Sequence, residues 1–378
     1  MGPGPSNISN RVLKAMSCPV IGHLDPQFLE LMNQIQGQLR RIFRTSNRLT
    51  IPISGTGSAG MEAAVLNFVS EGDPVLVCIN GVFGMRLAEV ARRAGARCET
   101  VSVPFGHPLD LDAVRQAARK HRPRVIAMVH AETSTGVLQS VQPVREICDE
   151  IDALLLVDAV TSLGGHPVLI DEWKIDICYS GTQKCLSCPP GLAPVTVSPR
   201  AEERLKARTQ PCRSWYLDLS LVQAYWGSQR TYHHTAPISM NYGLFEALRI
   251  IEEEGLEARW DRHKKNHQAL VAGLGAMGLK MAVDADSRLW SLNAVCIPEG
   301  IDDQTVRAEL LSRFNLEIGG GLGELNGKIW RVGLMGETSR AENVLYFLHA
   351  LGLCLQRQGY ATSPGAGLAA AAERLDCP

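Results

Sequence analysis

The sequence predicts an α/β protein with a mainly parallel sheet in its large domain and a smaller C-terminal domain of the α+β type. Between residues 50 and 200, short apolar runs alternate with amphipathic segments: 74–79 is followed by 85–94, and 124–129 by 144–151. This alternation is typical of parallel strands joined by helical crossovers. Ligands of such sheets gather where the strands end at their carboxyl termini. We therefore expect a ligand site at that edge.

The later part of the chain carries a different pattern. Two long helical patterns, 238–255 and 256–274, lead out of the expected sheet domain. Beyond them we expect a mixture of strands (293–297 and 328–332) and helices (302–313 and 340–353). The chain is therefore divided into an N-terminal segment (1–20), a large α/β domain (21–255), a small α+β domain (256–360) and a flexible tail rich in Gly and Ala (361–378).

The composition favours a protein that acts on small molecules in a reducing compartment. The 378 residues include 38 Lys and Arg against 39 Asp and Glu, so the formal net charge is −1, and we expect neither nucleic acid nor a membrane as a partner. The 11 cysteines are spread mostly singly, which indicates reduced thiols and a cytoplasmic location. We also expect no signal peptide and no membrane span, because the apolar runs are too short.

Two residues at expected strand ends point to a specific cofactor. Asp158 lies near the end of the apolar run 153–160. Lys184 follows the run 175–180 and stands 26 positions after Asp158. Pyridoxal phosphate needs an amine that forms a Schiff base with its aldehyde, and an anion that keeps its ring nitrogen protonated. We assign these roles to Lys184 and Asp158.

Three further segments belong to the same expected edge. The run 54–62 combines glycines and hydroxyls, including Thr56, Gly57 and Ser58, with the start of a helix, and such a helix entry either binds phosphate or is simply a turn. Phe83 follows the strand 74–79 and either stacks on a pyridine ring or belongs to the core. Thr133, after the strand 124–129, offers a hydroxyl to the cofactor or lies in a polar turn.

Other candidate signals are weaker. Adjacent histidines at 233 and 234 point in different directions and lack further ligands at metal spacing, so we expect no metal site. Cys185 and Cys188 form a single Cys-x-x-Cys, which we interpret as buried thiols. Arg331 interrupts a strand and either grips a substrate carboxylate or faces solvent.

Taken in order, these segments resemble the class V aminotransferases of pyridoxal-phosphate fold type I, and most closely the alanine-glyoxylate and serine-pyruvate aminotransferases. The resemblance spans nearly the whole chain. It depends on the combination of seven motifs: GPGPSN (2–7), SGTG (54–57), STGVLQ (134–139), SGTQK (180–184), PPG (189–191), YHHT (232–235) and GGGLG (319–323).

The resemblance implies a role for each matching residue in cofactor binding. It makes Lys184 the Schiff-base lysine, Asp158 the partner of the pyridine nitrogen and Phe83 the stacking ring. The remaining cofactor contacts that it implies come from Thr56, Gly57, Ser58, Thr133, Val160 and Gln183.

The resemblance also implies a homodimer with shared active sites, because Tyr232 and Thr235 match residues that serve the neighbouring subunit's phosphate site. Arg331 matches the arginine that binds the substrate carboxylate, and Gly4 lies in the segment 1–20 that lines the substrate pocket.

The expected activity is a ping-pong transfer of the amino group of L-alanine or L-serine to glyoxylate or pyruvate. Related aminotransferases that act on ureidoglycine, aminoethylphosphonate or pyridoxamine are alternatives. Cysteine desulfurase is a more distant one, because Gln183 stands where those enzymes usually carry histidine. A non-catalytic binding protein of the same fold is the alternative from a different class.

Overall fold

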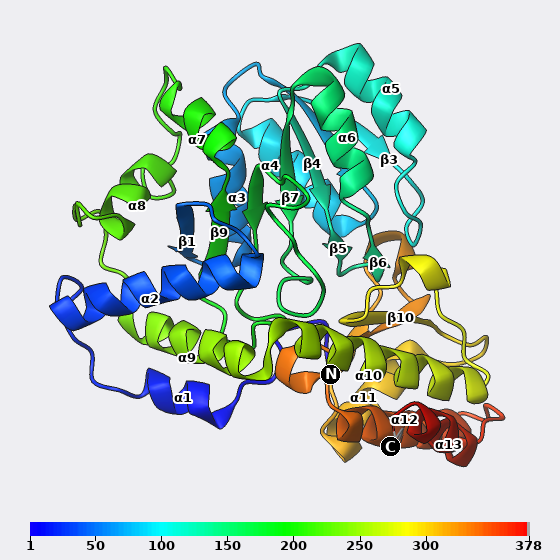
Figure 1. Ribbon diagram of the computed structural model, residues 1–378. Coiled ribbons are helices and arrows are strands. Elements are labelled where there is room, and N and C mark those ends of the chain that lie inside the picture. Colours follow the sequence, from blue (N-terminus) through cyan, green and yellow to red (C-terminus); the bar gives the residue numbers. More distant parts are fainter. Residues whose placement is uncertain (376–378) are drawn as a thin grey trace.

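The computed structural model describes residues 1–375, and its largest element is a seven-stranded sheet (Figure 1). The strands lie in the order β1-β9-β8-β7-β4-β2-β3. Strand β9 runs antiparallel to both neighbours, whereas the contacts from β8 through β7, β4 and β2 to β3 are parallel. The expected α/β fold with a mainly parallel sheet is confirmed. The bounds are β1 (Leu49–Ser54), β2 (Pro74–Ile79), β3 (Arg97–Ser102), β4 (Val125–Val129), β7 (Leu154–Asp158), β8 (Ile177–Tyr179) and β9 (Leu192–Val197).

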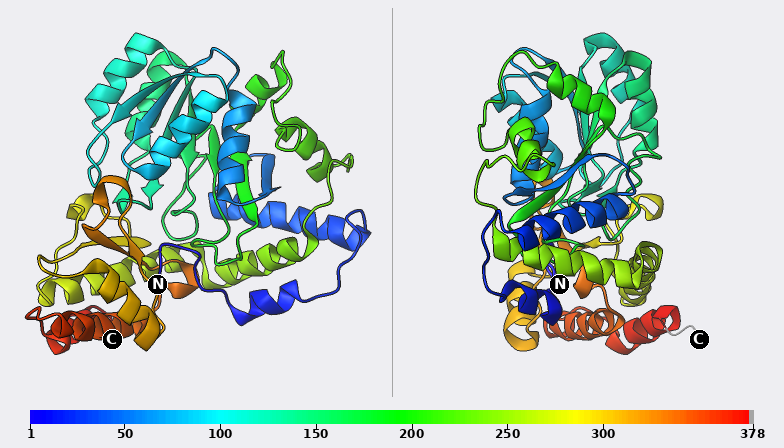
Figure 2. Two further views of the ribbon diagram at one scale, coloured as in Figure 1. Left: turned by 180° about the vertical axis from the view of Figure 1, so that it is seen from behind. Right: turned by 60° about the vertical axis from the view of Figure 1, so that its left-hand side comes forward.

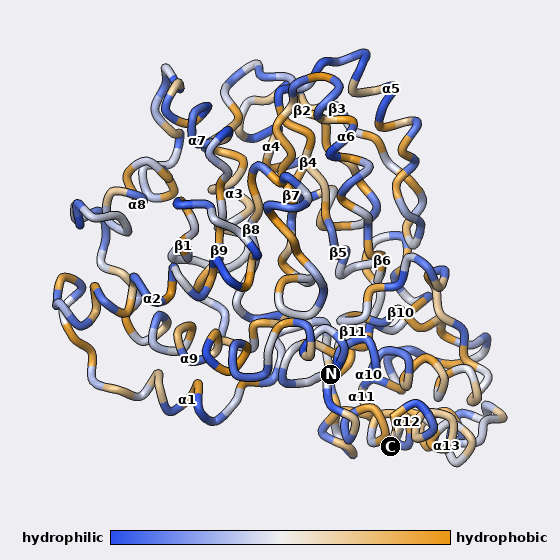
Figure 3. The backbone as a smooth tube through the Cα atoms, viewed as in Figure 1, coloured by the Kyte–Doolittle hydropathy of each residue, from blue (hydrophilic) through white to orange (hydrophobic). Residues whose placement is uncertain are grey.

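Helices cover both faces of this sheet (Figure 2). Helices α3 (Gly57–Phe68) and α4 (Val82–Arg93) pack against each other, and α5 (Leu111–His121) and α6 (Gln142–Ile151) form a second packed pair. Right-handed crossovers place the two pairs on opposite faces, because the chain moves across the sheet in opposite directions around them. The central strands are therefore buried on both sides and read as continuous apolar runs, which Figure 3 shows in orange.

Long helices lie along the edge where the parallel strands end. Helix α2 (Pro26–Phe43) begins at Asp25, whose side chain accepts a hydrogen bond from Gln27 N at 2.8 Å, and packs against α9 (Ile238–Glu254). Gly255, at φ 84°, separates α9 from α10 (Leu256–Ala276). Helix α1 (Asn10–Met16) also packs against α9.

The C-terminal part of the chain forms a second layer of the structure, built around a three-stranded antiparallel sheet in the order β10-β12-β11. Buried side chains such as Trp330 and Phe347 form a hydrophobic cluster separate from that of the large sheet. The expected strands and helices of this region are present, with ends shifted by a few residues, and the exact division into domains stays a prediction. The elements are β10 (Leu292–Cys296), α11 (Asp303–Phe314), β11 (Gly319–Gly320), β12 (Ile329–Gly333) and α12 (Ala341–Arg357).

Residues 361–375, the described part of the expected flexible tail 361–378, are ordered differently from that expectation. Residues Pro364–Leu375 form helix α13, which packs against α10 and α12 with Ala371 fully buried. Small residues permit this close approach: a Cβ added at Gly367 would lie 2.7 Å from the side chain of Met277. The Gly/Ala content therefore reflects tight helix packing. Residues 376–378 lie outside the described part of the chain.

The remaining elements are short. They are the hairpin β5 (Ala131–Glu132) and β6 (Val137–Leu138), the helices α7 (Pro199–Lys206) and α8 (Leu219–Trp226), and the 3-10 turns Ala285–Ser287, Gly323–Leu325 and Gly336–Thr338. Within residues 1–375, no helix combines the length and apolar character that crossing a bilayer requires.

Candidate active site

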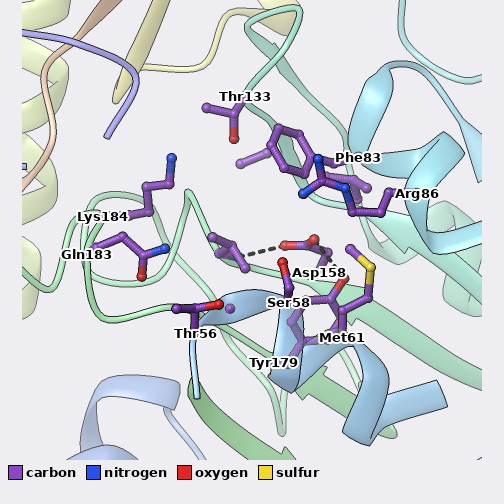
Figure 4. A pocket seen from close by; sticks show the side chains of 14 residues that line it. Thr56, Ser58, Met61, Phe83, Arg86, Thr133, Asp158, Tyr179, Gln183 and Lys184 are labelled. Atoms are coloured by element: carbon purple, nitrogen blue, oxygen red, sulfur yellow. Dashed lines mark hydrogen bonds between the residues drawn. The ribbon is translucent and has the colours of Figure 1, made fainter. Parts of the chain in front are cut away.

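The carboxyl ends of β1, β2, β4, β7 and β8 meet at one edge of the sheet, and the residues there line a cavity of about 160 Å³ (Figure 4). Residues from five separate stretches of the sequence thus face one space, as expected for ligand sites in such sheets. The predicted site residues among those lining the cavity are Thr56, Gly57, Ser58, Phe83, Thr133, Asp158, Val160, Gln183 and Lys184.

Asp158, the last residue of β7, is buried, and both of its carboxylate oxygens accept a hydrogen bond. Val160 N donates to Oδ1 at 2.8 Å, and Tyr179 Oη donates to Oδ2 at 2.7 Å. Burial raises the pKa of Asp158 to about 6, and the two hydrogen bonds and the charge of Lys184 oppose this rise. A cationic N–H group in the cavity would favour the charged carboxylate further.

Lys184 follows β8 and extends into the cavity (Figure 4). Burial lowers the pKa of its ammonium to about 8, and the charge of Arg331 lowers it further. A substantial fraction of neutral amine is therefore present at slightly alkaline pH, and the neutral amine is the nucleophilic form.

The N-terminal segment closes one side of the cavity over Lys184. Lys184 Nζ donates a hydrogen bond to the carbonyl oxygen of Pro3, and Ser6 Oγ donates to the carbonyl oxygen of Lys184 at 2.7 Å. A Cβ at Gly4 would lie 2.6 Å from Lys184 Nζ, and Gly4 has a φ of 103°. Only glycine fits this position without displacing the lysine.

The first turn of α3 forms an end of the cavity that is suited to an anion. Its N-cap, Thr56, makes no side-chain hydrogen bond to the helix, whereas aspartates cap α2, α5 and α11. Within the described residues, Ala59 N is the first amide of this helix with a backbone acceptor, at 2.8 Å from Thr56 O. The amides of Gly57 and Ser58 thus remain available to a ligand, where the helix dipole favours negative charge.

Phe83 lies in the first turn of α4 and lines the cavity. Arg86, one turn further on, places its guanidinium carbon 4.9 Å from the centroid of the Phe83 ring (Figure 4). An arginine at this distance interacts with the ring's π electrons, which fixes the orientation of both side chains.

Arg331, in β12, does not itself line the cavity, but it is bonded to the cavity-lining turn at Thr133. Its Nε donates to the carbonyl oxygen of Gly320 at 2.7 Å, and its Nη1 donates to the carbonyl oxygen of Thr133 at 3.3 Å. Burial lowers the pKa of this guanidinium, which is only 7% exposed. Within residues 1–375 it forms no ion pair with a carboxylate, so its charge has no direct counterion.

Comparison with known proteins identifies the family. Residues 8–323 match the model of the class V aminotransferases. The chain belongs to this family. It is 41% identical to the (S)-ureidoglycine–glyoxylate transaminase of Bacillus subtilis, over 98% of this chain and 94% of that protein.

Solved structures of aminotransferases show the same fold. The ureidoglycine–glyoxylate aminotransferase of B. subtilis superposes with a TM-score of 0.98 at 42% identity, covering 100% of this chain and 97% of that one. The alanine–glyoxylate aminotransferase of a Nostoc species gives a TM-score of 0.93 at 51% identity, covering 94% of each chain.

As a class V aminotransferase the protein uses pyridoxal 5′-phosphate, and the cavity fits this cofactor. The open amides of α3 suit the phosphate, and the buried Asp158 suits a protonated ring nitrogen. The Oε1 atom of Gln183 is buried without a hydrogen-bond partner among the described residues, so the amide at this position is free to meet a ligand. Lys184 offers an amine in the same cavity.

Four predicted site residues of the aminotransferase do not line this cavity: Gly4 and Arg331 contact residues that do, whereas Tyr232 and Thr235 lie away from it. Tyr232 and Thr235 are exposed, Tyr232 to 56%, and neither lines the cavity of its own chain. Their expected role concerns a neighbouring subunit, so it stays a prediction.

A chain of hydrogen bonds fixes the segment that carries these two residues. His233 Nε2 lies 3.1 Å from the carbonyl oxygen of Trp215, which can only accept, so this ring nitrogen carries a proton and donates it. His233 Nδ1 then accepts from His234 Nδ1 at 2.7 Å, and His234 Nε2 accepts from Ser54 Oγ at 2.7 Å. Burial lowers the pKa of His234, which favours its neutral form. The segment is therefore tied to the end of β1.

Sequence reasoning missed two polar residues that line the cavity of the aminotransferase, Tyr179 and Arg86, together with the apolar Met61, Val129 and Ala131. Tyr179 stands in the sequence as an ordinary apolar strand residue, and only the pairing of β7 with β8 places it opposite Asp158. Arg86 follows Phe83 by three positions, which is one helical turn, and this spacing was an available signal.

Proposed function

We propose that this class V aminotransferase transfers the amino group of a small amino acid to glyoxylate, releasing glycine and the 2-oxo acid of the donor. The buried Arg331 carries the proposal, because its guanidinium has no carboxylate partner among the described residues and borders the wall that contains Thr133. Amino and oxo acids supply such a carboxylate. Similarity to two glyoxylate-using enzymes supports the acceptor.

The donors that we propose first are L-alanine and L-serine, with (S)-ureidoglycine as the second candidate. Similarity to the B. subtilis ureidoglycine–glyoxylate transaminase favours the latter, and similarity to the Nostoc alanine–glyoxylate aminotransferase favours alanine. Pyruvate is the alternative acceptor. Pyridoxamine, which lacks an anionic group, fits the unpaired Arg331 less well. Aminoethylphosphonate offers a phosphonate that an arginine can also bind, and it ranks lower because neither of these two relatives is named for it.

Each proposed role follows from the position of the side chain. Bound pyridoxal phosphate supplies an aldehyde and an electron-accepting ring. Arg331 holds the substrate carboxylate by two parallel hydrogen bonds and thereby orients the Cα–H bond toward Lys184. The neutral Lys184 amine, favoured by its lowered pKa, removes that proton. The negative charge of Asp158 would keep the ring nitrogen of the bound cofactor protonated.

The same residues weigh against the two rival functions. Gln183 precedes Lys184 where cysteine desulfurases usually carry histidine, and its amide faces the cavity. A non-catalytic relative has no need of a lysine, an aspartate and an unpaired arginine around one cavity.

We also propose a cytoplasmic homodimer with shared active sites. Exposed aromatic side chains support the dimer: Trp215, Tyr216 and Tyr232 all lie in or beside the segment fixed by His233 and His234. A surface of this kind is characteristic of subunit interfaces. The singly spaced thiols support a reducing compartment.

Transfer of labelled nitrogen tests the function. The purified protein, loaded with pyridoxal phosphate, is incubated with glyoxylate and with ¹⁵N-labelled L-alanine, L-serine or (S)-ureidoglycine in turn. The proposal expects ¹⁵N-glycine from at least one donor, and the initial rates rank the donors. Absence of labelled glycine with all three donors would refute it.

A further inference from the structure

Glu132, which the proposed function does not use, is a fully buried carboxylate directly behind the wall of the cavity. It ends the short strand β5, between the cavity-lining residues Ala131 and Thr133. Its Oε1 accepts hydrogen bonds from Ser134 N at 3.0 Å and Ser134 Oγ at 2.5 Å. Four donors surround the carboxylate in all, so both oxygens are saturated, and no cation within residues 1–375 forms an ion pair with them.

The other two donors belong to the helix that carries the stacking ring. Oε2 accepts from Phe83 N at 3.1 Å and from Gly84 N at 3.2 Å. Ser134 Oγ in turn accepts from Val82 N at 2.9 Å. Glu132 and Ser134 together thus bind the first three amides of α4, the end of a helix where a negative charge is most favourable.

Gly81 makes this cap from a distant segment feasible. It occupies the N-cap position of α4 without a side chain that could cap the helix. A Cβ at Gly81 would lie 2.3 Å from Glu132 Cγ. Glycine at this position therefore leaves the space that the glutamate fills.

The same turn also reaches the arginine in the second layer. The carbonyl oxygen of Thr133 accepts from Arg331 Nη1, and Thr133 Oγ1 lies 2.6 Å from Thr161 Oγ1. Burial raises the pKa of Glu132, its four hydrogen bonds oppose the rise, and its charge raises the pKa of Arg331. The Glu132 carboxylate is therefore connected on one side to the helix that carries the Phe83 ring, and on the other side to the turn that binds Arg331.

We propose that Glu132 is a positioning residue that orients both the Phe83 ring and the Arg331 guanidinium around Lys184. It acts through the amides of α4 and the turn at Thr133, and touches neither cofactor nor substrate. The inference rests on the proposed roles of Phe83 and Arg331. It adds that affinity for the cofactor and affinity for the substrate carboxylate depend on the same buried group.

The variant Glu132→Gln tests this dependence, because all four groups around the carboxylate are donors and the new amide NH₂ must face at least one of them. We expect a dissociation constant for pyridoxal phosphate about tenfold higher, as for loss of a charge-assisted hydrogen bond. We also expect weaker visible circular dichroism of the bound cofactor, and a KM for the amino donor that rises more than kcat falls.

Asp176→Asn provides a matched control. Asp176 is also a buried carboxylate, accepting from Leu155 N at 2.9 Å and Arg145 Nη1 at 2.7 Å, but it does not line the cavity. The substitution Asp176→Asn should lower the melting temperature and leave cofactor affinity, dichroism and KM unchanged. The proposal is wrong if Glu132→Gln behaves in this way, or if both variants change the three readouts equally.

Ser134→Ala serves as the decisive variant if Glu132→Gln does not fold. It removes the hydroxyl that accepts from Val82 N and donates to Glu132, so the three readouts should shift in the same direction by a smaller factor. Unchanged readouts would overturn the proposal. Cofactor affinity and dichroism are measured without any amino-acid substrate. An error in the proposed amino donor would therefore leave these two tests intact.

Discussion

Tyr179 Oη donates a hydrogen bond of 2.7 Å to Asp158 Oδ2, and the two residues are direct partners in the adjacent parallel strands β8 and β7. Both side chains are buried, and Val160 N binds the other carboxylate oxygen at 2.8 Å. The carboxylate is thus fixed at the bottom of the cavity, and the tyrosine stabilises its charged form against the effect of burial.

Tyr179→Phe should weaken cofactor binding in a pH-dependent way. Loss of the hydrogen bond raises the pKa of Asp158 above its value of about 6, so less of the charged carboxylate is present near neutral pH. We expect the dissociation constant for pyridoxal phosphate to rise about 3- to 10-fold at pH 6.5 and to approach the wild-type value at pH 8.5. Titration of the apoprotein with cofactor at several pH values measures this.

Tyr225→Phe is the control for that substitution. Its hydroxyl donates to the carbonyl oxygen of His23 at 2.9 Å and does not line the cavity. A ratio of Tyr179→Phe to wild-type dissociation constants that does not vary with pH would contradict the role assigned to the tyrosine.

Asp158→Asn should stabilise the apoprotein at neutral pH. A pKa raised from 3.8 to about 6 means that the folded state holds this proton more tightly than the unfolded state. The charged carboxylate therefore costs folding free energy above pH 6, and the cost disappears as the pH falls toward 4. Removing the charge should increase the free energy of unfolding by up to about 3 kcal/mol at pH 7 and by only about 1 kcal/mol at pH 4.5. Urea unfolding at both values checks this.

Asp176→Asn gives the opposite expectation and serves as a comparison. Asp176 forms ion pairs with Arg145 and Arg200, so its loss should destabilise the protein at pH 7. An equal effect of Asp158→Asn at pH 7 and pH 4.5 would show that its charge is not the cause.

Arg331→Lys should separate substrate binding from cofactor binding. Lysine keeps the positive charge but cannot form two parallel hydrogen bonds with a carboxylate. We expect KM for both the amino donor and glyoxylate to rise about 10- to 100-fold, with cofactor affinity nearly unchanged. Steady-state kinetics with each substrate, together with cofactor titration, measure the two effects. Unchanged KM values would remove Arg331 from the substrate site.

Shared active sites can be tested by mixing inactive chains. One chain carries Lys184→Ala, and the other carries Tyr232→Ala with Thr235→Ala. In a hybrid dimer with shared sites, one site combines the intact Lys184 of one chain with the intact Tyr232 and Thr235 of the other. Refolding an equal mixture should therefore restore about a quarter of wild-type activity from two nearly inactive parents. No recovery, with hybrid dimers detected by native mass spectrometry, would contradict the sharing.

The sequence predicted much of the fold because its signals are local. Strands such as 125–129 and 154–158 are buried on both faces of the sheet, so their residues form continuous apolar runs. Such runs can be identified from the local sequence without knowing which strands pair with them. The placement of Asp158 and Lys184 at one sheet edge was predictable from the same kind of run, since Asp158 ends β7 and Lys184 lies in the loop that follows β8.

Relationships between distant segments were not predictable in this way. Glu132 reaches α4 across 49 positions, and Tyr179 meets Asp158 only through strand pairing. The Gly/Ala-rich segment 361–375 was misread as flexible because its composition is also that of a helix packed closely on α10. In each case a partner far along the chain decides the conformation or the role.

The most direct test of the central claim is the visible absorption spectrum of the purified protein during each half-reaction. We predict a cofactor band that is lost on addition of L-alanine, L-serine or (S)-ureidoglycine and that returns on addition of glyoxylate. Lys184→Ala should show neither change, because it lacks the amine that moves the proton. A wild-type protein that binds the cofactor but whose band responds to none of these donors would contradict the proposed function.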